Sequence, residues 1–151
     1  MRASSSYWVG TAIVLSAVAA AMPEAPATGA AEFGRVRATL QAPFVITLGA
    51  RAGEGAVVLT RWDGSRPWAG EYRITPDSSD DGMQALIVTG SVEHPTGVFR
   101  ATDGIVSITS SSLRHMAGRF ELHAVGFLAA DPDREDRELQ VRGSFTAKPS
   151  R

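Results

Sequence analysis

Two segments near the C-terminus alternate apolar and polar residues, and this pattern constrains the fold more than any other feature. Residues 116–124 read Met-Ala-Gly-Arg-Phe-Glu-Leu-His-Ala, and residues 137–147 read Arg-Glu-Leu-Gln-Val-Arg-Gly-Ser-Phe-Thr-Ala. A period of two puts the apolar side chains on one face of a β-strand, whereas a helix would scatter them around its axis. Each segment therefore predicts a strand with one face in the core and the other in water.

Shorter segments of the same kind precede these two. We expect strands near residues 34–40, 44–48, 56–61, 70–74, 84–92, 97–101 and 105–110. Several are separated by pairs that favour tight turns, because Gly has no Cβ and Asp can bond its own backbone. These pairs are Asp63-Gly64, Asp81-Gly82 and Asp103-Gly104. The predicted fold class is all-β: an antiparallel β-sandwich, or a flattened or closed β-barrel, of about eight or nine strands. Only the strand order would separate these architectures.

The N-terminus has the three parts of a secretory signal peptide. Arg2 and a short polar run precede an apolar stretch over residues 7–21, which ends in small residues with A-x-A sites closing at Ala19 or Ala21. The alternative is a membrane anchor, but a spanning helix takes about 20 apolar residues. We expect residues 1–21 to be a signal peptide and the protein to be exported, to the periplasm or the medium, without a stable membrane anchor.

The segment after the predicted signal has a different composition. Residues 22–32 are rich in Ala and Pro and contain only two charged residues. This composition predicts a flexible linker. Residues 33–151 then form a single all-β domain.

Charge and cysteine content exclude several classes of partner and bond. The formal net charge is −1, and removal of residues 1–21 takes away Arg2 and no acidic residue, which leaves −2. Nucleic acids and anionic membranes call for a concentrated basic face, so neither is an expected partner. The chain has no Cys, so it forms no disulfide and carries no lipid-modified cysteine.

The last third of the chain resembles a family of small exported bacterial β-domains of unknown function. The likeness lies in three segments, Gly-Ile-Val-Ser-Ile-Thr at 104–109, Gly-Arg-Phe-Glu-Leu-His-Ala at 118–124 and Val-Arg-Gly-Ser-Phe-Thr-Ala at 141–147, within roughly residues 72–148. Many members look like lipoproteins, and this chain departs from them because it lacks the cysteine. The resemblance implies the fold and an envelope address, with no activity and no site residues.

One aromatic turn is a candidate ligand-binding site. Trp62, Asp63, Arg66 and Trp68 lie close together in sequence, with Tyr72 just beyond. Exposed aromatic rings beside charged groups can stack on a sugar or anchor a protein partner. The alternative is that both tryptophans fold inward and cap one end of the core, with their N–H groups bonded to carbonyl oxygens.

An acidic turn resembles the start of a calcium loop. Asp77, Ser79 and Asp81 stand at alternate positions before Gly82, a spacing that lets side-chain oxygens converge on a hard cation. The twelfth position is Val88, where such a loop uses a bidentate Glu. Weak calcium binding is the only cofactor interaction that the sequence suggests. The alternative is a solvated hairpin turn.

The remaining reactive residues have the pattern of an ordinary polar surface. His94, His115 and His123 match no zinc-binding spacing. The serines at 110–112, beside Arg114 and His115, lack the G-x-S-x-G context of a nucleophile elbow and predict a polar hairpin loop.

Three classes of function stay open at this point. The first is a non-enzymatic binding or interaction module of the cell envelope, which would use the Trp-bearing turn or an exposed sheet edge on a protein or carbohydrate partner. The second is a structural or accessory protein without a small ligand. The third is an enzyme, and this interpretation requires a concave pocket that holds two or more of a small set of groups. The set is Asp63, Asp103, His94, His115 and His123.

Overall fold

The structure is a computed structural model and describes residues 13–16, 31–35, 43–49, 55–78, 81–90, 94–131, 133 and 136–149. These residues form nine strands and no helix, which confirms the predicted all-β class. The strands are β1 (Ile13–Ser16), β2 (Ala31–Arg35), β3 (Phe44–Leu48), β4 (Ala56–Arg61), β5 (Gly70–Arg73), β6 (Met83–Gly90), β7 (Pro95–Ser112), β8 (His115–Leu128) and β9 (Arg137–Pro149).

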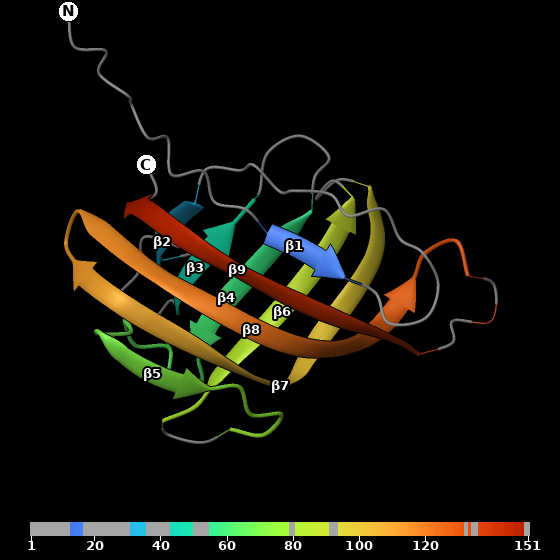
Figure 1. Ribbon diagram of the computed structural model, residues 1–151, viewed down its shortest axis with the longest axis horizontal. Helices are drawn as coiled ribbons and strands as arrows, with labels where there is room; N and C mark the ends of the chain where they lie inside the picture. The colour runs from blue at the N-terminus through green and yellow to red at the C-terminus, as the bar shows by residue number, and fades with distance from the viewer. Residues whose placement is uncertain are drawn as a thin grey trace, which may run out of the picture.

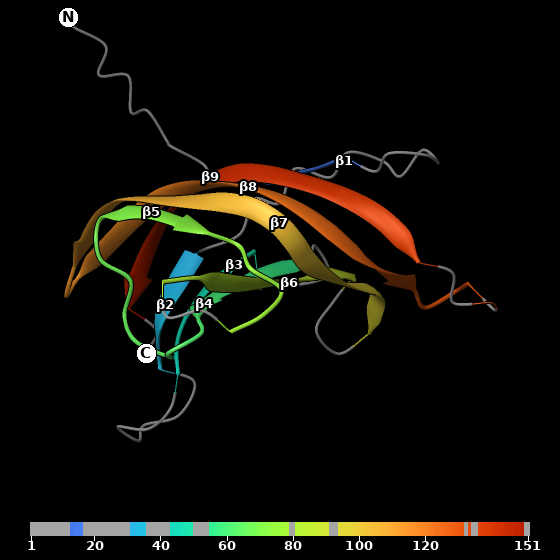
Figure 2. The same ribbon diagram turned by 90° about the horizontal axis from the view of Figure 1, so that it is seen from below.

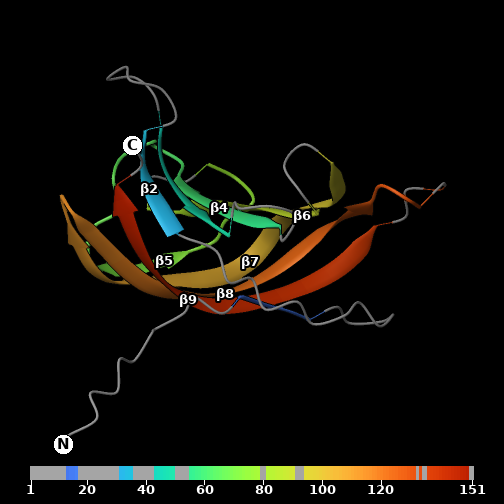
Figure 3. The ribbon, with the colours of Figure 1, turned by 90° about the horizontal axis from the view of Figure 1, so that it is seen from above.

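Backbone pairing closes seven of the strands into a ring. In order around the ring these are β2, β3, β4, β6, β7, β8 and β9, and β9 pairs with β2 to complete it. β1 and β5 lie outside the ring, where β1 extends the edge of β9 and β5 extends the edge of β7. The three longest strands, β7, β8 and β9, run together across the front of the molecule, with β3, β4 and β6 crossing behind them (Figure 1). Figures 2 and 3 show the same arrangement edge-on, as two facing layers.

The pairing between β2 and β9 corrects the expectation of a purely antiparallel sheet. Residues 31–33 of β2 run parallel to residues 147–149 of β9, while the other strand pairs are antiparallel. No short turn joins the two strands, and a hairpin is what imposes the antiparallel direction. A contact between two ends of a chain leaves no turn signal in the sequence.

A second correction concerns the pair Asp103-Gly104, which does not form a hairpin turn. The strands expected at 97–101 and 105–110 are one continuous strand, β7, with a shift of register between Ala101 and Asp103. Gly104 has a φ of 142°, and a Cβ built there would clash with the carbonyl oxygen of Glu121 on β8. Because Gly104 has no Cβ, the backbones of β7 and β8 can approach closely at this irregular point in the sheet.

The alternation on β8 and β9 is confirmed as a core face. Met116, Phe120 and Leu122 of β8 are buried, with Val141 and Phe145 of β9 beside them. The rings of Phe120 and Phe145 lie 6.4 Å apart between centroids. Side chains from β3, β4 and β6 complete the same cluster from the facing layer: Phe44, Ile46, Leu48, Val57, Leu59, Met83, Ala85 and Ile87. Burial of these side chains contributes about 1.5–3 kcal/mol for each large one.

The N-terminal predictions fall only partly on described residues. β1 lies within residues 1–21, and its residues pair with 140–143 of β9. β2 begins at Ala31, two residues inside the expected linker, and the rest of residues 22–32 lies outside the described residues. The part of the chain that the structure describes contains no helix that could span a membrane. The signal peptide and the linker stay predictions.

Substitution of Gly104 tests the close approach of β7 and β8. We expect Gly104→Ala to lower the free energy of unfolding by about 2 kcal/mol, because the added Cβ meets backbone that cannot move aside cheaply. Urea denaturation followed by circular dichroism gives the value. Thr109→Ala, at an exposed position of the same strand, is the control and should cost no more than about 0.5 kcal/mol. Equal losses for the two variants would contradict this explanation of the glycine.

Candidate binding surfaces

The turn after β4 is built around the Asp63 carboxylate. It accepts hydrogen bonds from the backbone N–H of Ser65 at 2.9 Å and from the Ser65 hydroxyl at 3.0 Å. The guanidinium of Arg61 lies 3.1 Å away as an ion pair. Gly64 takes a φ of 68°, a conformation that glycine adopts without a steric penalty. Asp63 therefore shapes the turn, which was expected from the Asp-Gly pair.

These contacts set the charge of Asp63. Burial raises the pKa of Asp63, but the Ser65 hydrogen bonds and the charge of Arg61 outweigh that effect, so the pKa lies below its ordinary value. Asp63 is thus held ionised by its own turn.

Trp62 has its indole N–H bonded to a backbone carbonyl oxygen, as the alternative interpretation of the aromatic turn expected. Its indole N–H donates to the backbone oxygen and to the hydroxyl of Thr75, each at 3.1 Å. The ring is half-buried, and the guanidinium of Arg100 lies 5.8 Å from its centroid. Trp62 anchors the turn to the segment after β5.

Trp68 has the opposite placement, because 63% of its surface is exposed. The Tyr72 hydroxyl accepts a hydrogen bond from the backbone N–H of Trp68 at 2.9 Å and donates one to the backbone carbonyl oxygen of Trp68 at 3.0 Å. The backbone under the ring is therefore held at both polar atoms. The structure presents this indole to solvent on a fixed support.

Arg66 joins the aromatic turn to the rest of the fold. Its guanidinium carbon lies 5.1 Å and 5.4 Å from the ring centroids of Phe33 and Phe44, and 5.8 Å from that of Trp68. Contacts at these distances combine charge–quadrupole attraction with stacking of the planar guanidinium.

Hydrogen bonds tie the same turn to the β7–β8 hairpin. Arg66 donates to the hydroxyl of Ser111 at 3.2 Å and to the carbonyl oxygen of Ser112, and the Ser111 hydroxyl donates to the carbonyl of Pro67 at 2.9 Å. The next residue, Leu113, is 83% exposed. Two large exposed apolar side chains thus belong to two loops that are bonded together.

We call Arg66, Trp68 and Leu113 the Trp68 surface. Sequence analysis included Arg66 and Trp68 but missed Leu113. Leu113 could have been noticed in the sequence because it is an apolar residue between polar neighbours in a two-residue turn, and such turns normally contain polar residues. The bonding of its loop to the loop of Trp68 depends on contacts between residues more than 40 positions apart.

The residues of the predicted calcium loop are only partly described. Asp77 and Asp81 are exposed, and Ser79 lies outside the described residues. Within the described ranges, no three His, Asp or Glu side chains are grouped so as to hold a metal ion. Calcium binding at this turn stays a prediction.

His94, His115 and His123 are all exposed, and His115 lies beside a serine hydroxyl. The Ser110 hydroxyl and Nδ1 of His115 are 3.1 Å apart across the exposed β7–β8 hairpin, which is the polar hairpin expected there. His123 lines a shallow hollow of about 150 Å³ together with Glu138 and Gln140. The enzyme interpretation requires at least two of Asp63, Asp103, His94, His115 and His123 in one pocket, and this hollow contains one of them, His123.

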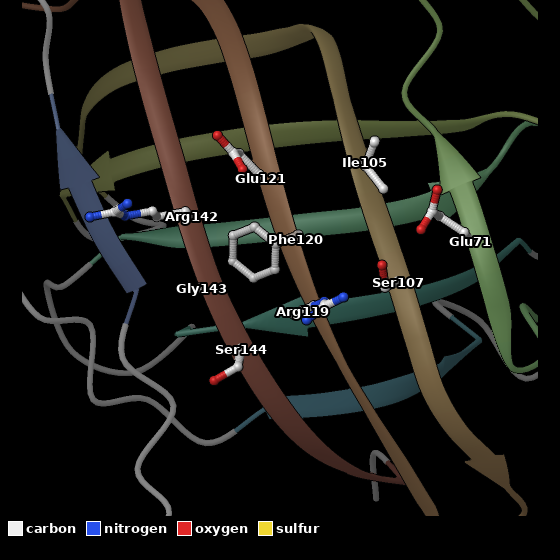
Figure 4. A pocket seen from close by; sticks show the side chains of 9 residues that line it. All are labelled: Glu71, Ile105, Ser107, Arg119, Phe120, Glu121, Arg142, Gly143 and Ser144. Atoms are coloured by element: carbon white, nitrogen blue, oxygen red, sulfur yellow. The ribbon is translucent and has the colours of Figure 1, made fainter.

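A larger hollow opens on the outer face of β5, β7, β8 and β9, and we call it the outer hollow. It has a volume of about 580 Å³ and is shown in Figure 4. It is lined by Glu71, Ile105, Ser107, Arg119, Phe120, Glu121, Arg142, Gly143 and Ser144. None of the proposed site residues belongs to it. It arises from cross-strand register, which the sequence does not contain.

No family model matches the chain, no curated protein matches its sequence, and no solved structure matches its fold.

Fluorescence quenching distinguishes the two tryptophans. In a Trp8→Phe background, which removes the third tryptophan, we expect iodide to quench the Trp62→Phe variant strongly, because only the exposed Trp68 ring then emits. The Trp68→Phe variant should be quenched several-fold less, because the Trp62 ring is half-buried and bonded to Thr75. Similar quenching constants in the two variants would contradict the described placement of the rings.

The charge of Asp63 predicts a pH-dependent contribution to stability. A carboxyl whose pKa is lowered by folding stabilises the protein above its unfolded pKa, and this contribution is lost as the pH falls through the folded pKa. We therefore expect the stability difference between the parent and Asp63→Asn to shrink as the pH is lowered below about 4. Ser65→Ala should reduce the pH dependence because it removes one hydrogen bond. Urea midpoints from pH 7 to pH 2.5 measure both effects, and a difference that stays constant over this range would contradict the interpretation.

Proposed function

We propose that this protein is a non-enzymatic interaction module of the bacterial cell envelope and that the Trp68 surface is its contact with a protein partner. The envelope address in this proposal follows from the predicted signal peptide and from the resemblance of residues 72–148 to exported bacterial domains. The contact surface follows from the described residues. The ring of seven strands is in our interpretation a flattened, closed barrel, which serves as a rigid support for the loops at its end.

The observation that carries the proposal is the exposure of Trp68 on a fixed backbone. Tryptophan dominates the energetics of protein interfaces when it enters a pocket of the partner. Ordering a loop on binding costs free energy, and a loop that is already held avoids much of that cost. The two hydrogen bonds of Tyr72 to Trp68 supply such a support.

The neighbours of Trp68 favour a protein over a sugar as the partner of this surface. Leu113 is exposed and apolar and offers no hydrogen bond to a hydroxylated ligand. Two of the three guanidinium nitrogens of Arg66 already donate hydrogen bonds within the fold. Nε donates to Ser111 and Nη2 donates to Ser112. An apolar centre of Trp and Leu with a cationic neighbour is typical of protein–protein contacts.

Site-specific crosslinking tests the proposal in cells that express the full chain. A photo-reactive residue at position 113 should form a crosslink to one partner protein, which mass spectrometry identifies. The same residue at position 146, an exposed site on β9, is the matched control and should not capture that partner.

Binding of the purified partner then decides the role of Trp68. We expect Trp68→Ala to weaken binding by about 30-fold, as for a central tryptophan of an interface, while Trp68→Phe keeps part of the affinity. Both variants should keep the melting temperature of the parent to within a few degrees, since the ring is exposed. Unchanged affinity in Trp68→Ala, or equal capture from positions 113 and 146, would contradict the proposal.

A further inference from the structure

Cross-strand register assembles a row of polar side chains across the outer hollow. Glu71 on β5 lies opposite Ser107 on β7, Ser107 lies opposite Arg119 on β8, and Arg119 lies opposite Ser144 on β9. All four residues line the hollow (Figure 4). The row thus places one guanidinium between two hydroxyl groups, with a carboxylate at one end.

Arg119 has no charged partner in this arrangement. Its direct neighbours on both adjacent strands are serines, and it forms no ion pair with any described residue. Its side chain extends from β8 toward Ser107, into the space that the hollow leaves open (Figure 4). A guanidinium has five donors in a planar fork that matches the two oxygens of a carboxylate.

The next row of the sheet contains a second arginine, which also lines the hollow. Arg142 lies directly opposite Glu121, but its side chain extends toward β1 (Figure 4), and Glu121 accepts a hydrogen bond from Gln140 at 3.3 Å. Ile105, which is 40% exposed, adds an apolar patch to the same wall. The hollow therefore offers positive donors, hydroxyl groups, carboxylate acceptors and a small apolar contact together.

We infer that the outer hollow binds an acidic saccharide, with the sugar carboxylate on Arg119 and sugar hydroxyls donating to Glu71 and to the serines. The two carboxylates of the wall, Glu71 and Glu121, disfavour a phosphate monoester, which concentrates close to two negative charges on one group, because like charges repel at short range. A saccharide with one carboxylate per ring carries a single charge on each ring, spread along the ligand, together with several hydroxyl donors. The volume of about 580 Å³ lies in the range of small-ligand sites, which suits a ligand of two or three rings.

This site is independent of the Trp68 surface. It is built by strands that belong to the predicted mature domain and uses none of Arg66, Trp68 and Leu113. A failure of one proposal therefore leaves the other unaffected.

Titration of the full chain with oligogalacturonates of two and three residues tests the inference. Calorimetry or nuclear magnetic resonance measures the binding. The parent should bind these acidic sugars, and the neutral galactose oligomers of equal length should bind at least ten-fold more weakly. Arg119→Gln should weaken binding of the acidic sugars about ten-fold or more, because the charge-assisted pair is lost. Arg114→Gln removes the same charge at an exposed turn outside the hollow and should leave the affinity unchanged.

Glu71→Gln separates recognition of a sugar from plain attraction of an anion. If Glu71 accepts hydrogen bonds from the sugar hydroxyls, this variant binds oligogalacturonate more weakly than the parent. If the hollow only attracts negative charge, removal of a carboxylate strengthens binding, and that result would overturn the inference. Equal affinities for the acidic and neutral sugars, equal effects of Arg119→Gln and Arg114→Gln, or no binding by the parent would also overturn it.

Discussion

The structure depends on the pairing that brings the C-terminal end of β9 against β2. β7, β8 and β9 form a long curved layer whose inner face is apolar, and such a face is stable only when another layer covers it. β2, β3, β4 and β6 supply that cover, and the contact of residues 31–33 with 147–149 joins them to β9. This contact also pairs backbone of β2 and β9 that would otherwise form unpaired strand edges.

Closure places two different kinds of surface on one small domain. At the end of the ring, Arg66 stacks among Phe33, Phe44 and Trp68 and bonds the β7–β8 hairpin, so that the core itself supports the exposed indole. On the outer face, the long antiparallel strands place charged and hydroxyl side chains in rows that no described strand covers. The first surface has an apolar centre and the second a polar one, so they are suited to different partners.

The candidate residues named from sequence show where local patterns suffice and where they fail. Asp63 and Gly64 form the turn that the Asp-Gly pair favours, because the contacts of the Asp63 carboxylate lie within two residues. Asp103 and Gly104 carry the same pair and form an irregularity inside β7, because the backbone of β8 approaches there. The two tryptophans lie in one turn yet differ in burial. Thr75 binds the indole N–H of the half-buried Trp62, whereas Tyr72 binds the backbone of the exposed Trp68.

The sequence by itself determined the all-β class, the identity of the strands at the C-terminus and which of their residues face the core, because a period of two forces alternate side chains to opposite faces. Only the tertiary structure decided the parallel β2–β9 pairing, the continuity of β7, the bonding of the Leu113 loop to the Trp68 loop and the composition of the outer hollow. Each of these depends on contacts between residues far apart in the chain. Register and strand order arise from the packing of the whole core, and no single segment encodes them.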